Sequence, residues 1–362
     1  MRLTHRLFVA ALALTTSAFA QNHYAWQQLP VQANIANIGI PQLDINQSNQ
    51  VVGQTTGKLA FISSGGTVQA LGTFGGPTSN AHGINDFGVA AGSADVSATN
   101  YHPFTSNGGP LNDLGTLNGG AYANAFDINF YGDVVGQAID GVTNQRQAYI
   151  YLGSGGPLTG LGTLAGSNSL FASAAYGVNN NDEVVGFSTK GDFTSDAFSW
   201  TFGGGMVDLG TLGGSFSTAT RVNDNGDVVG YSTLVGDSAS RGFIDIGGVM
   251  QAVNSPIGGD SFAMDLNLSD QVVGLYSSNV GTRAFINEGG SSYDLTTLLN
   301  TALPGGASVA EAYAINDNGA IAAIGTDGFV YVLTPAAVPE PCSLLVVAGF
   351  GLMALRRRAT KR

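Results

Sequence analysis

The chain of 362 residues has few of the groups from which cofactor and metal sites are usually built. Its one cysteine, Cys342, lies near the end, so the preceding residues can form neither a disulfide nor a thiolate metal site. After residue 20 only His23, His82 and His102 remain, and none lies four residues from another, so we expect packed or surface histidines. No Gly-x-Ser-x-Gly elbow occurs, and 57–59 is only a partial phosphate loop. We therefore predict no cofactor and no resident metal.

Charged residues are also scarce, at 10% of the chain, whereas 44% of the residues are hydrophobic. This balance excludes an intrinsically disordered chain, which needs high net charge and few apolar groups. Seven of the thirteen Lys and Arg residues lie at the two ends, which leaves six between them. Against these six stand 24 acidic residues once Glu340 is set aside, so the body of the chain carries a net charge near −18. We expect neither nucleic acid nor an anionic membrane surface as a partner of this body.

The first 20 residues have the three parts of an export signal in the right order. Arg2 and Arg6 precede an apolar run over 7–14, and Ala18 and Ala20 flank Phe19 as at a signal peptidase site. We predict a helical signal peptide over 1–20 that signal peptidase removes, and a mature chain that begins near residue 21. A buried N-terminal helix is the alternative interpretation.

The last 25 or so residues carry a second three-part pattern. Proline stiffens the segment 338–341, an apolar run of 12 residues over 344–355 follows, and a basic cluster ends it. The run is shorter than the ~20 residues that span a bilayer comfortably, and the cluster would stay on the cytoplasmic side. The residues that define the pattern are Val338, Pro339, Glu340, Pro341, Arg356, Arg357 and Arg358.

This pattern resembles the PEP-CTERM sorting signal that exosortases handle in Gram-negative bacteria. Cys342 stands where that family usually has Ser or Thr. The resemblance implies an exosortase-type processing enzyme as a partner and transient insertion of a transmembrane helix over 336–362 into the inner membrane. Cell-surface display or secretion would follow. A plain C-terminal anchor helix is the alternative.

Between these ends, residues 21–335 repeat one unit. An aliphatic residue followed by Asn and a polar turn recurs at intervals of 39 to 50 residues. A period near 45 is typical of repeat architectures. The seven Asn residues are Asn46, Asn85, Asn129, Asn179, Asn223, Asn267 and Asn316.

Each unit contains four short runs rich in Val, Ile, Phe and Thr and bounded by Gly, Asn, Asp or Ser, which is the pattern of β-strands. The Asn-Asp-x-Gly stretch predicts a hairpin with a left-handed residue. Paired valines such as Val228-Val229 place apolar groups on both faces of one strand, which then needs a sheet on each side. The glycine after the pair suits a close approach of backbones. No helical periodicity is sustained in this region.

We therefore predict an all-β fold, a seven-bladed β-propeller with four-stranded blades. The chain enters with a lone strand, Tyr24–Leu29, and leaves with another, Gly328–Leu333. Pairing of these two strands would close the ring and leave no open edge. A linear β-solenoid is the alternative fold, although solenoid repeats are usually shorter.

The units resemble the HAF-repeat family of bacterial extracellular proteins. The resemblance rests on blocks such as Leu-Gly-Thr-Leu at 209–212, Ile-Asn-Asp at 84–86 and Val-Val-Gly at 228–230, whereas the His-Ala-Phe tripeptide varies, as in His102-Pro103-Phe104. That family has no firmly assigned chemistry, so the resemblance implies an extracellular location and a repeat architecture.

These patterns predict an exported, non-enzymatic surface or exopolysaccharide-matrix protein that displays loops for binding. Exopolysaccharide or other surface proteins are the expected partners. A secreted polysaccharide hydrolase or lyase is an alternative, because propellers often host such sites. Its candidate residues are those that do not recur between units, namely Asp140, Arg146, Asp192, Asp196 and the loop 298–304.

A weakly calcium-binding propeller is the third interpretation. The segments 223–227 and 317–319 crowd Asp and Asn oxygens of the kind that Ca²⁺ prefers. Their spacing does not match a calcium loop, and hairpin turns use the same residue types.

Overall fold

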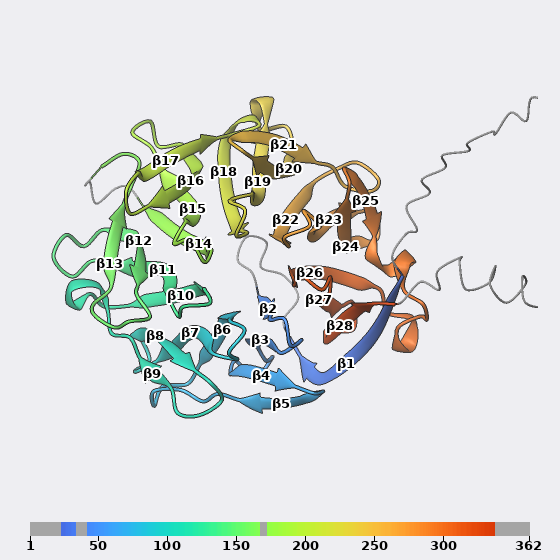
Figure 1. Ribbon diagram of the computed structural model, residues 1–362, viewed down its shortest axis with the longest axis horizontal. Helices are drawn as coiled ribbons and strands as arrows, with labels where there is room; N and C mark the ends of the chain where they lie inside the picture. Colours follow the sequence, from blue (N-terminus) through green and yellow to red (C-terminus); the bar gives the residue numbers. More distant parts are fainter. Residues whose placement is uncertain (1–22, 34–41, 167–171, 337–362) are drawn as a thin grey trace, which may run out of the picture. The chain divides into compact units, whose positions relative to one another are not determined.

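The computed structural model describes residues 23–33, 42–166 and 172–336, which form strands joined by turns around a central axis (Figure 1). Four one-turn 3₁₀ helices interrupt the strands, at Leu117–Gly119, Val235–Asp237, Leu295–Leu298 and Pro304–Gly306. Within these ranges no helix has the length and apolar character needed to cross a membrane. The predicted signal peptide and, apart from residue 336, the predicted sorting tail lie outside the described residues.

Six blades of four antiparallel strands follow one another along the chain, as the repeat predicted. Their strands are β2 (Leu43–Ile45), β3 (Val51–Gln54), β4 (Ala60–Ser64), β5 (Thr67–Ala70); β6 (Ser79–Ile84), β7 (Ala90–Asp95), β8 (Tyr101–Ser106), β9 (Asn112–Asp113); β10 (Ala123–Ile128), β11 (Val134–Ile139), β12 (Arg146–Tyr151), β13 (Thr159–Gly162); β14 (Ser173–Val178), β15 (Val184–Thr189), β16 (Ser195–Thr201), β17 (Gly205–Gly210); β18 (Gly213–Val222), β19 (Val228–Leu234), β20 (Ser240–Ile246), β21 (Val249–Val253); and β22 (Ser261–Leu266), β23 (Val272–Ser278), β24 (Gly281–Glu288), β25 (Ser291–Asp294). A parallel pair, Ser195 with Phe216, links two neighbouring blades.

The closing blade joins the two ends of the repeat region, so the propeller prediction is confirmed. Strand β1 (Tyr24–Gln32) pairs antiparallel with β28 (Phe329–Pro335), which continues into β27 (Ile321–Gly325) and β26 (Val309–Ile315). The blue and red strands lie side by side in Figure 1. The pairing of β1 with β28 joins the first and last units and closes the ring.

The paired valines lie in the second strand of the blades and are almost fully buried, as the sequence predicted. Val228 and Val229 point to opposite faces of β19, and each packs in a different hydrophobic cluster between neighbouring blades. The glycine after the pair is required by a close approach of backbones. A Cβ atom on Gly186 would overlap with the carbonyl oxygen of Ala174 on the adjacent strand.

The Leu-Gly-Thr-Leu blocks do not lie wholly within the fourth strands. Leu71 and Leu114 follow β5 and β9, whereas Leu161 and Leu209 lie near the ends of β13 and β17. Gly72 and Gly115 have φ values of 85° and 76°, and such left-handed residues turn the chain away from its neighbour.

The long segment 298–304, a candidate for catalysis in the sequence, packs against the closing strand instead. The amide of Asn300 donates a hydrogen bond of 2.9 Å to the carbonyl oxygen of Tyr24. Nε1 of Trp26 donates to the carbonyl and to the hydroxyl oxygen of Thr301, both at 3.0 Å. These contacts give the segment a role in holding β1 in place.

Candidate binding surface at the pore mouth

The seven repeated Asn residues lie at one end of the propeller, in the turns that follow the inner strands. We call this end the Asn face. Each Asn Oδ1 accepts hydrogen bonds from the backbone amides two and four residues later, and this shapes the turn. The residue three positions after each Asn has positive φ, as the turn prediction required. These residues are Asn49, Gly88, Gly132, Asp182, Gly226, Asp270 and Gly319.

Each Asn also reaches the next blade. Its Nδ2 donates a hydrogen bond to the backbone carbonyl of the following repeat Asn, with distances of 2.9 to 3.3 Å. The last of these bonds runs from Asn316 to Asn46, so seven bonds form a closed ring. One side chain thus specifies a turn and joins two blades, and we call this set the Asn ring.

A buried arginine lies beneath the Asn ring. Arg221 on β18 is 5% exposed, and its guanidinium donates hydrogen bonds to the carbonyl oxygens of Tyr176 and His82 at 2.7 and 3.4 Å. Carboxylate oxygens of Asp44, Asp127 and Asp265 lie 3.8 to 4.0 Å from its nitrogens. These four residues come from four different blades, so they tie together inner strands on opposite sides of the axis.

The three carboxylates also bond to backbone. Oδ2 of Asp44, Asp127 and Asp265 accepts an amide hydrogen from the inner strand of the following blade, at 2.7 to 2.9 Å. Burial raises the pKa of Asp265 to about 8 and that of Asp44 to about 6, although Arg221 lowers both. Burial opposes the charge of Arg221, but the carboxylates together hold its pKa above the ordinary value. The charged groups of the cluster therefore have their partners within the protein.

Above this cluster the Asn face opens into a shallow polar cup of about 180 Å³. The first residue after the ring Asn lines this cup in six of the seven blades. This residue and the next one vary among the blades, although the pair Asp-Asn occurs twice. In order they are Gln47-Ser48, Asp86-Phe87, Phe130-Tyr131, Asn180-Asn181, Asp224-Asn225, Leu268-Ser269 and Asp317-Asn318.

Three aromatic side chains break this polar pattern in two neighbouring blades. Phe87, Phe130 and Tyr131 are 66%, 42% and 66% exposed. The ring centroids of Phe87 and Phe130 are 4.6 Å apart, and those of Phe130 and Tyr131 are 5.5 Å apart. Beside them is a cavity of about 550 Å³ that Thr105 and Asn112 also line. We call these three residues the aromatic patch.

The catalytic candidates predicted from the sequence lie away from the Asn ring and in separate contact networks. Both oxygens of Asp140 accept hydrogen bonds, from the amides of Val142 and Thr143 and from the side chains of Asn118 and Gln147. These bonds, led by the amide of Thr143, hold its pKa below the usual value. Arg146 donates to the hydroxyl of Tyr122 at 2.8 Å.

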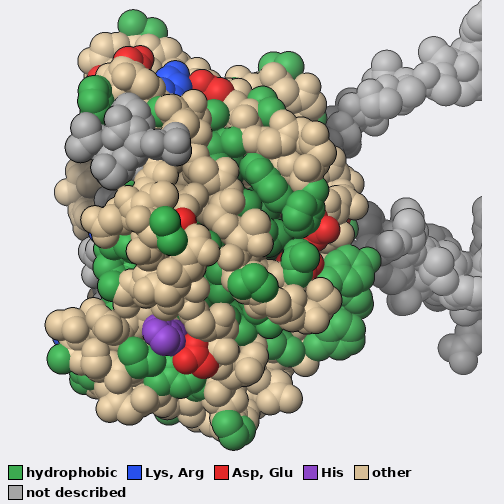
Figure 2. Space-filling model, turned by 90° about the vertical axis from the view of Figure 1, so that its left-hand side faces the viewer, with side chains coloured by type: hydrophobic (Ala, Val, Ile, Leu, Met, Phe, Trp, Pro, Cys, Tyr) green, Lys and Arg blue, Asp and Glu red, His purple; other side chains and the backbone are tan. Residues whose placement is uncertain are grey.

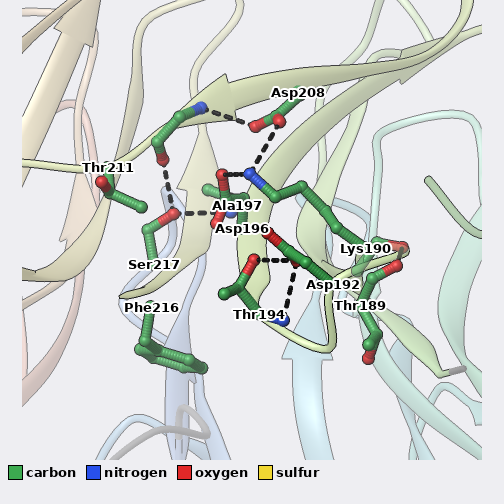
Figure 3. Close-up of polar contacts among 12 residues, drawn as sticks. Thr189, Lys190, Asp192, Thr194, Asp196, Ala197, Asp208, Thr211, Phe216 and Ser217 are labelled. Atoms are coloured by element: carbon green, nitrogen blue, oxygen red, sulfur yellow. Dashed lines mark hydrogen bonds and ion pairs between the residues drawn. The ribbon is translucent and has the colours of Figure 1, made fainter. Parts of the chain in front are cut away.

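The other two candidates belong to the next blade, in the loop before β16 and at its start (Figure 3). Asp192 accepts from the amide and hydroxyl of Thr194. Asp196 pairs with Lys190 at 2.6 Å, and Lys190 also lies 3.4 Å from Asp208. Burial raises the pKa of Asp196, whereas the Thr194 contacts lower that of Asp192. The contacts of these four candidates are all local, and none joins the two blades.

The turns proposed for calcium use their oxygens within the protein. Oδ1 of Asn223 accepts from two amides of its own turn, and Asp224 accepts from the amide and side chain of Asn180 in the preceding blade. In the described ranges no three His, Cys, Asp or Glu residues gather in a way that could hold a metal ion.

The histidines occupy ordinary positions. His102 lies 2.9 Å from a carboxylate oxygen of Asp113 near the surface, and the ring of buried His82 packs on Phe126 in the pore. Figure 2 shows one side of the molecule, where uncharged polar groups and hydrophobic patches dominate and charged side chains are few.

The sequence patterns described above indicated neither the aromatic patch nor the Arg221 cluster. Alignment of the units on the ring Asn would have indicated both. Two positions before it the residues are Asp44, Gly83, Asp127, Gly177, Arg221, Asp265 and Ala314, so one arginine stands among carboxylates and small residues. Two positions after it, only Phe87 and Tyr131 are aromatic.

No protein-family model matches the chain, and no curated protein matches it. Solved propellers are similar to it in fold. YCF48 bound to D1 peptide superposes with a TM-score of 0.51 at 10% identity, covering 90% of this chain and all of the other. The extracellular domain of the putative hybrid two component system BT4673 from B. thetaiotaomicron gives 0.51 at 11% identity, covering 88% of this chain and 40% of that one. At these identities the similarity establishes the β-propeller fold alone.

Proposed function

We propose that the protein is an exported, non-enzymatic surface or exopolysaccharide-matrix protein that binds its ligand on the Asn face. The observation that carries this proposal is the contrast between constant and varied positions on that face. The Asn ring is the same in all seven blades, whereas the pair of residues after the ring Asn takes six different forms among them, with only Asp-Asn occurring twice. A rigid support with varied exposed side chains is the arrangement of a binding scaffold.

Two further points support the proposal. Propellers are typical scaffolds of binding and interaction proteins, and one propeller of similar fold was solved with a bound peptide. The segments 1–20 and 336–362 have the order of parts that export and C-terminal sorting require. Transient anchoring in the inner membrane, followed by surface display or release, is the location we propose.

Export is tested by expressing the complete chain in a Gram-negative host with an exosortase and analysing the fractions by mass spectrometry. We expect the exported form to begin at Gln21 and to lack the tail from near residue 338 onward. A host without exosortase is the matched control, and it should retain the tail on the membrane. Protein that stays in the cytoplasm with an intact first segment would contradict the proposal.

Binding and catalysis are separated by a second measurement on the exported protein. We expect it to associate with cells or extracellular matrix of the producing organism and to release no reducing or unsaturated ends from matrix polysaccharide. Steady release of such ends would instead identify a hydrolase or lyase.

A further inference from the structure

We propose that the aromatic patch and the cavity beside it bind an uncharged polysaccharide chain, with sugar rings stacked on Phe87, Phe130 and Tyr131. This inference rests on the proposed function, because it assigns a ligand class and a place to the binding on the Asn face.

The aromatic patch is exposed although nothing in the repeat requires aromatic residues there. The equivalent turn positions of the other five blades hold Ser or Asn at the second place, and these turns form the same hydrogen bonds. Exposed rings in contact with one another form an apolar surface that water solvates poorly, and such surfaces mark interaction sites. The departure from the repeat therefore calls for a ligand rather than a folding explanation.

The geometry of the rings suits flat ligands with apolar faces. Phe87 and Phe130 are tilted by 47° at a centroid distance of 4.6 Å, and Tyr131 stands at 85° to Phe130. The rings thus present faces in different directions around one hollow. The negative face of an aromatic ring attracts the weakly positive C–H groups that cover the faces of a pyranose ring.

The rest of the cavity supplies neutral hydrogen-bonding groups. Thr105 and Asn112 line it, and Nδ2 of Asn112 donates to the Thr105 hydroxyl at 3.2 Å near the surface. Tyr151 belongs to the same lining. The cavity volume of about 550 Å³ lies in the range of small-ligand sites, roughly 300–1,000 Å³. Sugar hydroxyls could pair with these groups while the sugar faces cover the rings.

The charge of the cavity and of the protein decides which kind of polysaccharide, neutral, anionic or cationic, fits the site. The lining residues of the cavity include no Lys, Arg, Asp or Glu. An anionic polysaccharide would find no cation there, and the strongly acidic body of the protein would repel it. A cationic chain would find no carboxylate in the cavity. An uncharged polysaccharide meets neither penalty, so it is the occupant to which the site is complementary.

The test uses the chain as the producing cells export it and substitutions that the repeat already tolerates. In Phe87→Asn and Tyr131→Asn each ring is replaced by the residue found at the same turn position in three other blades. Phe202→Asn is the matched control, because Phe202 is also an exposed ring, 58% accessible and paired with Trp200, but lies outside the cavity. Unchanged melting temperatures would show that all variants fold.

The probes are the neutral and the anionic fractions of the producing organism's matrix polysaccharide, separated on an anion exchanger and cast into native gels. We expect the neutral fraction to retard the wild-type protein and the Phe202→Asn control equally. Retardation should weaken at least about tenfold in each patch variant, which is the effect of losing a central binding residue.

Each other outcome overturns the inference. Retardation by the anionic fraction alone, no retardation by either fraction, or equal retardation of patch variants and wild type would exclude a neutral-polysaccharide site at these rings. The proposed function is judged separately, by association of the wild-type protein with cells and matrix. If that association persists in the patch variants, the protein binds its matrix elsewhere, and only the aromatic patch is ruled out.

Discussion

Replacement of Asn179 measures how much the Asn ring contributes to stability. The side chain of this residue, like that of Asn85, makes only the three hydrogen bonds that all ring members share. Its Oδ1 accepts from the amides of Asn181 and Glu183 at 3.0 and 2.9 Å, and its Nδ2 donates to the carbonyl of Asn223 in the next blade at 2.9 Å. The side chain is almost fully buried, so water can replace these partners only in part.

The size of the effect follows from the groups left without partners. Asn179→Ala leaves two amides without a partner, and each such buried group costs about 1–3 kcal/mol. It also removes one of two hydrogen bonds to the Asn223 carbonyl, which keeps the bond from the Gly226 amide. Because the turn lies near the surface, we expect a total loss of about 3–5 kcal/mol in the free energy of unfolding. Asn179→Asp keeps the acceptor for the turn but places an oxygen against the Asn223 carbonyl, so we expect a loss of about 1–3 kcal/mol.

Urea unfolding followed by circular dichroism gives the free energy of unfolding for both variants. Asn181→Ser is the control, since Ser48 and Ser269 occupy the same turn position in other blades. It removes only an exposed hydrogen bond from Nδ2 of Asn181 to the carbonyl oxygen of Asp224 and should change stability by less than about 0.5 kcal/mol. If Asn179→Asp is as stable as the wild type, the bonds between blades contribute nothing and the ring is only a set of turns. If both variants match the control, the side chain is not a structural element at all.

Three further predictions concern packing, charge and closure. Gly186→Ala should lower the free energy of unfolding by about 2 kcal/mol or more, because the new Cβ would overlap a neighbouring carbonyl oxygen. Gly203 has open space around it, so Gly203→Ala should change the free energy of unfolding little in the same urea assay. Stability should fall between about pH 4 and about pH 8, because burial holds the pKa of Asp265 at about 8 and the folded state therefore keeps a proton that the unfolded state releases. Urea unfolding at several pH values should show a smaller fall for Asp265→Asn. Trp26→Phe removes the hydrogen bonds from Nε1 to Thr301, which join the closing strand β1 to the segment 298–304, and should accelerate unfolding in stopped-flow mixing by about tenfold.

The features that the sequence predicted are those with local causes. The Asn turn is built from residues within five positions, and the valine pair with its glycine reports the surroundings of one strand. The closure of the ring could also be predicted, because the first and last strands are complementary parts of one unit. Each of these required only the repeat and the chemistry of a few adjacent residues.

The features that the sequence did not predict depend on residues brought together by the ring itself. The Asn ring joins residues at least 39 positions apart, and its last bond spans 270. Arg221 meets Asp44 across 177 positions of the chain, a contact that no local pattern contains. The fourth strand does not continue past the glycine of the Leu-Gly-Thr-Leu block, which has positive φ at Gly72, Gly115, Gly162 and Gly210, and the residue types of the block do not reveal this conformation.

Departures from the repeat therefore separate into two kinds, and the difference between them points to function. Arg221 departs from its equivalents, but carboxylates and carbonyl groups of other blades surround it, so the fold itself accounts for its presence. The aromatic patch departs as strongly, yet its rings contact mainly one another and solvent. A residue that differs from its equivalents in the other blades and has its partners inside the protein serves the fold. A residue that differs and stays exposed is expected to contact a ligand. We therefore expect binding at Phe87 and Tyr131 and not in the pore.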